Sequence, residues 1–217
     1  MSQPAASRLY AGETSEQRQG GRRVRLVEAG IELLGTGGRE GTTVRAVCAA
    51  ARLTPRYFYE SFENLDELQV AVLDHVLSGA TVQVLAAVDG APSDVGARTR
   101  ATIEAFVSFV VDDPRRARIV FAEAFGNEAM MERRQAALAA LATLASEQAQ
   151  ALYGSLEGTD PLVRTTALML AGGVAEVLLA YTAGELDTSR EELVADVVAL
   201  IEATGAAAAA IAVERQG

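Results

Sequence analysis

Apolar residues recur at intervals of three and four along almost the whole chain, and this period is the strongest constraint on its fold. The alternation of apolar and polar residues that is typical of strands is almost absent. A period of 3.6 residues places the apolar side chains on one face of a helix, where they can pack against other helices. The clearest example is a stripe of four residues: Val24, Val27, Ile31 and Leu34. The sequence therefore predicts an all-α protein.

Residues that favour helix ends divide this pattern into separate helices. The first predicted helix carries that stripe and ends at the glycine-rich residues 35–38, because glycine commonly follows the last turn of a helix. Thr54 followed by Pro55 is a typical helix start, and Ser189 with Glu192 forms a capping box. The other predicted helices cover residues 44–51, 55–62, 65–88, 94–111, 114–126, 127–153, 161–183 and 190–204. The alanine run in residues 205–217 either extends the last helix or frays.

The composition excludes several classes of site. The 217 residues suffice for one or two domains, but they include one cysteine, Cys48, and one histidine, His75. A disulfide within the chain or a Cys/His zinc site needs more of these residues, and the carboxylates show no metal-ligand spacing. We therefore expect no metal, no cofactor and no enzymatic activity, and we expect Cys48 to be a small buried residue. The sequence shows neither a signal-peptide pattern nor an uninterrupted apolar span. We therefore also expect a cytoplasmic protein with no membrane partner.

The charges are unevenly distributed. The net charge is −10, yet residues 18–58 hold eight arginines against three acidic residues, a balance of +5. Residues 66–217 hold ten arginines against twenty-two acidic residues, a balance of −12. This asymmetry predicts a small module that binds an anion, joined to a larger acidic body. We therefore divide the chain into a flexible arm (residues 1–20), a small basic domain (residues 21–65) and an acidic domain (residues 66–217).

The basic domain contains the spacing of a helix-turn-helix unit. The predicted helices at residues 44–51 and 55–62 are separated by a turn of three residues. The second helix of such a unit lies in the major groove of DNA, and residues near its N-terminus reach the base edges. Thr54, Arg56 and Tyr57 occupy that end. Arg56 can donate two hydrogen bonds to guanine, whereas Tyr57 and Tyr59 can donate to phosphates.

The preceding helix adds further candidate contacts. Thr43 at its start offers a hydroxyl group beside exposed backbone N–H groups, which suits an anion. Arg45 and Arg52 supply positive charge nearby. A solvated basic face is the alternative for these arginines, but the motif favours contact with DNA. Phe58 and Phe62 lie one helical turn apart and are expected to pack in the core.

Residues 41–47 (Gly-Thr-Thr-Val-Arg-Ala-Val) and 53–62 (Leu-Thr-Pro-Arg-Tyr-Phe-Tyr-Glu-Ser-Phe), continued to Leu68, resemble the DNA-binding domain of the TetR family of transcriptional regulators. The resemblance implies an all-helical homodimer with about three helices for DNA and about six for effector binding and dimerisation. It also implies that Thr43 and Tyr59 contact phosphates and that Arg56 and Tyr57 face bases or adjoining phosphates. Most members of the family are repressors that a small ligand releases from DNA.

Two positions depart from the family pattern. Leu65 stands where the family usually has a lysine beside the phosphate backbone, and leucine cannot make that contact. Arg52 stands in the turn where the family favours glycine. A residue with a Cβ is strained there if the turn requires a positive φ.

The acidic domain contains candidates for an effector pocket and for a dimer interface. Helical bundles that hold ligands are lined by apolar residues and few polar groups, so we select His75, Phe106, Phe109, Phe121, Phe125 and Met130 as candidates. The alternative is that the aromatic and methionine residues are core and that His75 lies between the domains. The last two predicted helices are apolar over more than half of their circumference, which predicts a two-fold interface unless both helices are fully buried in a monomer.

Together these features predict a ligand-responsive, homodimeric DNA-binding transcriptional regulator. The simplest form is a repressor that a small, largely apolar effector releases from a palindromic operator. A helical enzyme or ligand-binding carrier with an unused DNA-binding module is a second class, although no nucleophile with its base and no cofactor loop supports it. A module whose acidic body binds another regulator is a third class, which a monomeric protein indifferent to DNA would favour.

Overall fold

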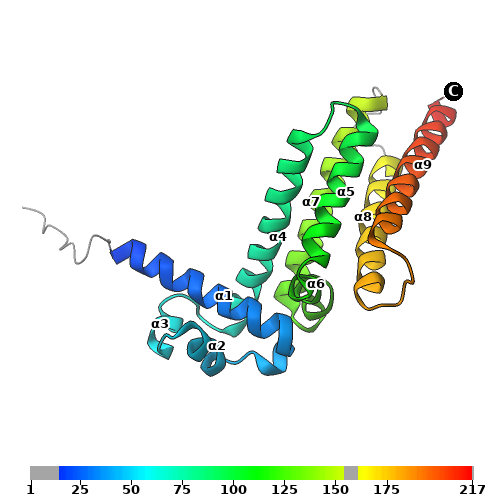
Figure 1. Cartoon of the computed structure of the whole chain (residues 1–217). Helices are drawn as coiled ribbons and strands as arrows, with labels where there is room; N and C mark the ends of the chain where they lie inside the picture. Colours follow the sequence, from blue (N-terminus) through cyan, green and yellow to red (C-terminus); the bar gives the residue numbers. More distant parts are fainter. Residues whose placement is uncertain (1–14, 154–160, 217) are drawn as a thin grey trace, which may run out of the picture. The chain divides into compact units, whose positions relative to one another are not determined.

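The computed structural model describes residues 15–153 and 161–216, and the elements in these ranges are helices joined by short turns (Figure 1). The predicted all-α fold is confirmed. The chain divides into two compact units, residues 1–72 and 73–217. The first unit therefore extends seven residues beyond the predicted boundary, because the first two turns of a long helix belong to its core.

The first unit consists of α1 (Ser15–Gly41), α2 (Val44–Ala51), α3 (Pro55–Tyr59) and the start of α4 (Leu65–Gly90). Helix α1 packs against both α2 and α3. The side chains that fill the core are almost completely buried: Leu26, Leu34, Val47, Phe58, Phe62 and Leu68. Cys48 is buried as predicted, and this burial raises the pKa of its thiol.

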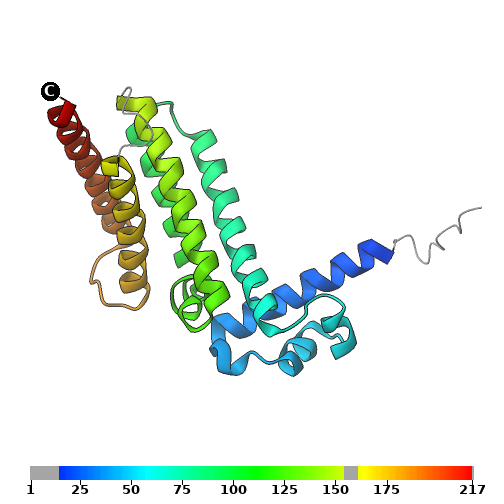
Figure 2. The same ribbon diagram turned by 180° about the vertical axis from the view of Figure 1, so that it is seen from behind.

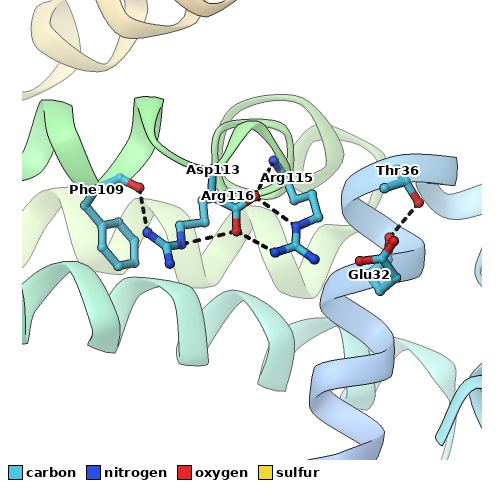
Figure 3. Close-up of polar contacts among 6 residues, drawn as sticks. All are labelled: Glu32, Thr36, Phe109, Asp113, Arg115 and Arg116. Carbon is cyan, nitrogen blue, oxygen red and sulfur yellow. Dashed lines mark hydrogen bonds and ion pairs between the residues drawn. The ribbon is translucent and has the colours of Figure 1, made fainter.

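One prediction about α1 was wrong and one was borne out. Residues 15–20 of the expected flexible arm form its first turns, while residues 1–14 lie outside the described part of the chain. The predicted end within residues 35–38 falls on the last of them, because residues 35–37 are still helical; here the hydroxyl of Thr36 donates to the carbonyl of Glu32 at 2.6 Å (Figure 3). The helical φ/ψ values are interrupted only at Gly38, where φ is +66°, a conformation that glycine adopts at little cost.

The predicted start of α4 is confirmed. The side chain of Asn64 accepts a hydrogen bond from the N–H of Glu67 at 2.9 Å, as an N-cap residue does. The Glu67 carboxylate in turn accepts from the N–H of Glu63 at 2.6 Å. Helix α3 is shorter than predicted, because Glu60 and Ser61 form a turn that leads to Phe62.

The second unit is a bundle of long helices that lie side by side (Figures 1 and 2). Helix α8 packs along α7 and α9, and α5 packs along α9. A π-helical turn and a 3₁₀ turn follow the short helix α6. After the remainder of α4, the elements are α5 (Val95–Val111), α6 (Pro114–Ala117), the π turn Arg118–Ala122, the 3₁₀ turn Glu123–Gly126, α7 (Glu128–Tyr153), α8 (Pro161–Thr182) and α9 (Arg190–Gln216).

A polar cluster joins the end of α5 to α6. Asp113 caps α6 and accepts hydrogen bonds from Arg115, which lower the pKa of its carboxyl group (Figure 3). Arg116 lies 3.6 Å from the same carboxylate and donates to the carbonyl of Phe109 at 3.0 Å. Its guanidinium carbon is 4.1 Å from the centroid of the Phe109 ring. This turn is therefore held by an arginine that spans both helices.

The capping box at the start of α9 is confirmed. The N–H of Glu192 donates to the Ser189 hydroxyl oxygen at 3.2 Å, and the N–H of Ser189 donates to the Glu192 carboxylate at 3.0 Å. Hydrogen bonds from Ser189 and Thr188 lower the pKa of Glu192. These contacts fix where the last helix begins, and the alanine-rich tail extends it to Gln216, which is one of the two outcomes left open for the residues after 204.

Candidate DNA-binding site

The turn between α2 and α3 depends on a strained residue. Arg52 has φ +54° and ψ +45°, and it is the one non-glycine residue with a positive φ among the residues that the structure describes. This positive φ explains why the TetR-family motif favours glycine at the position of Arg52. A left-handed residue with a Cβ costs roughly 1–2 kcal/mol, which the surrounding contacts have to offset. The N–H of Leu53 closes the turn by donating to the carbonyl of Cys48 at 2.9 Å.

The six predicted DNA contacts lie on α2 and α3 or at the start of these helices. Thr43, Arg45, Thr54, Arg56 and Tyr59 are exposed, and Tyr57 is half-buried. Thr43 is the N-cap of α2, and its hydroxyl oxygen accepts from the N–H of Ala46 at 3.1 Å. Because that contact uses only the oxygen, the hydroxyl proton can be donated to a phosphate. Thr54 precedes α3 without a side-chain capping bond, so its hydroxyl can also reach a partner.

Arg56 is a highly exposed candidate base contact, with 83% of its side chain accessible. Its Nε donates to the Glu60 carboxylate at 2.9 Å, and this bond raises the pKa of the guanidinium group. Since the bond uses Nε, the two terminal amino groups can donate together to guanine O6 and N7. The guanidinium group of Arg56 is therefore charged and accessible, and its Nε is bonded to Glu60.

The three aromatic residues of α3 divide between core and surface. Phe58 is fully buried and packs edge-on against Tyr59, with ring centroids 5.3 Å apart, and against Phe62 at 5.8 Å. Both phenylalanines were correctly predicted as core residues. Tyr59 is 60% exposed, so its hydroxyl group is accessible to a phosphate. Tyr57 is covered on one face by Arg22, whose guanidinium carbon is 4.5 Å from the ring centroid.

Sequence reasoning missed three arginines of α1 that hold this surface in place. Arg23 donates to the carbonyl of Ser61 at 2.7 Å, and its guanidinium lies over the ring of Phe62 at 4.2 Å. Arg25 donates to the carbonyl of Ala51 and, at 3.3 Å, to that of Arg52. Arg22 pairs with Glu60 at 3.6 Å. Their partners lie 26 or more residues away in the sequence, so no local pattern indicates these contacts.

The candidates for an effector pocket lie in different environments of the second unit. Phe109, Phe121 and Met130 are buried, and Phe106 is half-buried. His75 is exposed, and Phe125 is 54% exposed with the guanidinium of Arg134 at 5.1 Å from its ring centroid. The placement of His75 and Phe125 therefore does not support the prediction that they line an interior pocket.

Phe109 is also a packing residue. A Cβ added to Gly79 on α4 would lie 3.0 Å from the tip of the Phe109 ring, so the two helices approach closely at this point. Phe121 belongs to the π-helical turn, and the N–H of Met130 donates to the side chain of Asn127 at 3.1 Å. Phe109, Phe121 and Met130 therefore contribute to the core of the bundle, which was the alternative that the sequence left open.

The outer faces of α8 and α9 carry exposed apolar side chains. Met169 on α8 is 59% exposed, and Leu200 and Val213 on α9 are 63% and 69% exposed. By length and composition alone, α4, α8 and α9 could each cross a membrane, although the sequence analysis found no uninterrupted span. Both helices also bury a face against the bundle, through Leu178 on α8 and Val197 on α9, for example.

Comparison with solved structures identifies the fold. No protein-family model and no curated protein matches the sequence. Among solved structures, a TetR-family transcription regulator from Marinobacter aquaeolei VT8 aligns with a TM-score of 0.61 at 17% identity, over 87% of this chain and 97% of that one. The chain has the fold of the TetR-family regulators. The agreement covers the bundle as well as the helix-turn-helix unit.

Two further structures with this fold are regulators with a stated role or ligand. The fatty acid degradation regulator FadR from Bacillus halodurans aligns with a TM-score of 0.69 at 15% identity, over 83% of this chain and 94% of that one. AibR, solved in complex with isovaleryl coenzyme A and operator DNA, aligns with a TM-score of 0.61 at 19% identity, over 83% of this chain and 97% of that one. Identities of this size relate the chain to both proteins by fold.

We expect Arg25→Ala to loosen α2 and α3. Two carbonyl groups at the end of α2 would lose a charged donor, which costs about 1 kcal/mol at a partly exposed site. Hydrogen exchange of the α2 and α3 amides in the full chain measures this loosening. Arg18→Ala removes the same charge from the exposed surface of α1 and is the matched control. Equal exchange rates in the two variants would contradict a bracing role for Arg25.

Proposed function

We propose that the chain is a ligand-responsive, homodimeric DNA-binding transcriptional regulator, in its simplest form a repressor. The observation that carries the proposal is the exposed N-terminal end of α3, where Arg56 and Tyr57 follow a tight helix-turn-helix turn. The TetR-regulator fold of the whole chain supports it. We place this activity in the cytoplasm and expect no membrane partner.

In this proposal α3 enters the major groove. Arg56 reads a guanine through its two terminal amino groups, and Tyr57 and Thr54 contact the neighbouring base or phosphate. Thr43 and Tyr59 donate their hydroxyl protons to phosphates, while Arg45 adds positive charge. The phosphate contacts fix the register of the protein on the duplex, and Arg56 supplies the base preference.

We place the dimer interface on α8 and α9. The apolar side chains exposed on these helices, including Met169 and Leu200, are what a second copy of the chain would cover. A two-fold axis through these helices would pair two α3 helices. On B-DNA their half-sites would be about 34–36 Å apart, one turn of the duplex, so a palindromic operator is expected.

We place the effector in the second unit, near its buried apolar residues. FadR has a role in fatty acid degradation, and AibR binds isovaleryl coenzyme A. The isovaleryl group bound by AibR is small and apolar, as predicted for the effector, whereas the coenzyme A part of that ligand is large and carries phosphates. Acyl-coenzyme A thioesters are therefore the first class of ligand to test on this chain.

We expect Arg56→Ala and Tyr59→Phe to have different effects on DNA binding. A random-sequence duplex library is first selected with the unchanged protein, and affinities for the selected duplex and its single-base variants are then measured. Arg56→Ala should flatten the preference at one guanine, by about 1–3 kcal/mol. Tyr59→Phe should weaken binding to all the duplexes by a similar factor, because it removes a phosphate contact.

Two outcomes of these measurements would contradict the proposal. If Tyr59→Phe changed the base preference and Arg56→Ala did not, the two roles would be reversed. If the unchanged protein enriched no sequence from the library, the proposal of a sequence-specific DNA-binding protein would be wrong.

We expect Leu200→Asp to convert the dimer into a monomer. A charge in the centre of an apolar interface loses its hydration and has no partner, which disfavours association strongly. Sedimentation equilibrium measures the mass of the assembly. Val82→Asp is the matched control, since Val82 is 69% exposed but lies on α4. Dissociation by the control variant alone, or a monomeric unchanged protein, would contradict the assigned interface.

We expect isovaleryl-coenzyme A to raise the melting temperature more than free coenzyme A does. An apolar acyl group adds binding energy in an apolar pocket, and a ligand at 100 times its Kd stabilises the protein by about 2.7 kcal/mol. The same thioester should release the selected duplex if the protein is a repressor. Equal effects of the two compounds would argue against an acyl-binding pocket while leaving the DNA-binding half of the proposal intact.

A further inference from the structure

Glu60 lies at the end of α3 and bridges two arginines with its two carboxylate oxygens. One oxygen accepts from Nε of Arg56 at 2.9 Å, and the other lies 3.6 Å from a terminal nitrogen of Arg22. Arg56 is four residues earlier on α3, whereas Arg22 belongs to α1. The carboxylate therefore connects the exposed end of α3 to the helix that braces it.

Glu60 and Arg22 together contact two of the candidate base contacts, Arg56 and Tyr57. Arg22 lies over the ring of Tyr57 at 4.5 Å, and 23% of its side chain is exposed, against 83% for Arg56. The side chain of Gln19 adds a contact to the backbone carbonyl of Glu60 at 3.4 Å. Glu60 thus ties the most exposed of these arginines to one that is mostly covered.

An exposed arginine that nothing holds can adopt many rotamers and can pair with any phosphate within reach. The bond from Nε to Glu60 removes much of this freedom and leaves the edge with the two terminal amino groups. That edge matches the O6 and N7 acceptors of guanine. The negative charge of Glu60 also opposes nearby phosphates, so it weakens binding that depends on backbone charge alone.

We propose that Glu60 is a positioning residue for base specificity, which directs Arg56 to guanine and lowers the affinity for non-specific DNA. The inference rests on the proposed function, and it adds a residue that does not itself contact the base. Loss of Glu60 should therefore change two measured quantities in opposite directions. It should reduce the discrimination at the guanine that Arg56 reads, and it should strengthen binding to unselected DNA.

The test uses the full chain and a duplex that the unchanged protein selects from a random library. Each guanine of that duplex is replaced in turn by 7-deazaguanine, which lacks the N7 acceptor. In the unchanged protein, one guanine in each half-site should lose about tenfold in affinity on replacement. Arg56→Ala should abolish this loss, which identifies the guanine that Arg56 reads.

The Glu60 variants are then measured on the same duplexes. Glu60→Ala should reduce the 7-deazaguanine effect to less than about threefold and strengthen binding to an unselected duplex by a similar factor. Glu60→Gln keeps an acceptor for Nε of Arg56 without the charge. It should therefore retain more of the discrimination than Glu60→Ala and show the same gain in non-specific affinity.

Glu63→Gln is the matched control, because it removes the same charge from the next turn of the chain and Glu63 has no side-chain contact to Arg56. It should leave the 7-deazaguanine effect unchanged. A purely structural role would lower the melting temperature of Glu60→Ala without changing the ratio of affinities. A full tenfold effect in Glu60→Ala would overturn the inference, whereas failure of the unchanged protein to select any duplex would overturn the proposed function itself.

Discussion

A helix of five residues cannot keep its shape in water on its own, so everything proposed for α3 depends on how the rest of the unit holds it. The burial of Phe58 and Phe62 supplies the apolar part of that support. Their rings pack against each other and fix the inner side of α3. The outer side can then consist of exposed polar and charged residues, which contribute little to stability and remain accessible to a partner.

The polar part of the support comes from α1. Arginine suits this role because its planar group offers five donors at the end of a long apolar stem, which can cover an aromatic ring and still reach a carbonyl. Arg23 does both at Phe62 and Ser61, and Arg25 satisfies carbonyl groups at the end of α2, beside the strained Arg52. The strain of a left-handed arginine is therefore located where α1 can compensate for it.

The sequence predicted those parts of the fold that are determined by neighbouring residues. The predicted starts at residues 65, 114 and 190 coincide with helices that Asn64, Asp113 and Ser189 cap, because a cap bonds to a backbone group within three residues. The bridging of α1 to α3 by arginine could not be predicted, since tertiary packing sets such partners. The end of the regular helix within residues 35–38 was predicted correctly, because Gly38 adopts a positive φ that glycine tolerates, but the local pattern did not show which of the three glycines would end it.

In the candidate site, too, some features are determined by neighbouring residues and others by tertiary packing. The exposure of Arg56 and Tyr59 follows from the motif, but the electrostatic character of the surface depends on which arginines are already engaged. Of the eight arginines in residues 18–58, Arg22, Arg23 and Arg25 contact groups within the unit, and a carboxylate lies against Arg56. Several arginines behind the sequence balance of +5 are therefore fixed in place, and the single carboxylate of Glu60, which lies outside residues 18–58, offsets part of the charge of Arg22 and Arg56.

A surface of this kind has a physical consequence for the mode of recognition. Non-specific binding depends on the number of phosphates that basic side chains neutralise, and each neutralised phosphate adds to the salt dependence. Leucine at position 65 neutralises no phosphate, and the net charge of −10 on the whole chain weakens its long-range attraction to DNA. In the proposed complex, contacts with bases would therefore supply a larger part of the affinity for an operator, and accurate placement of Arg56 would matter more than the total charge.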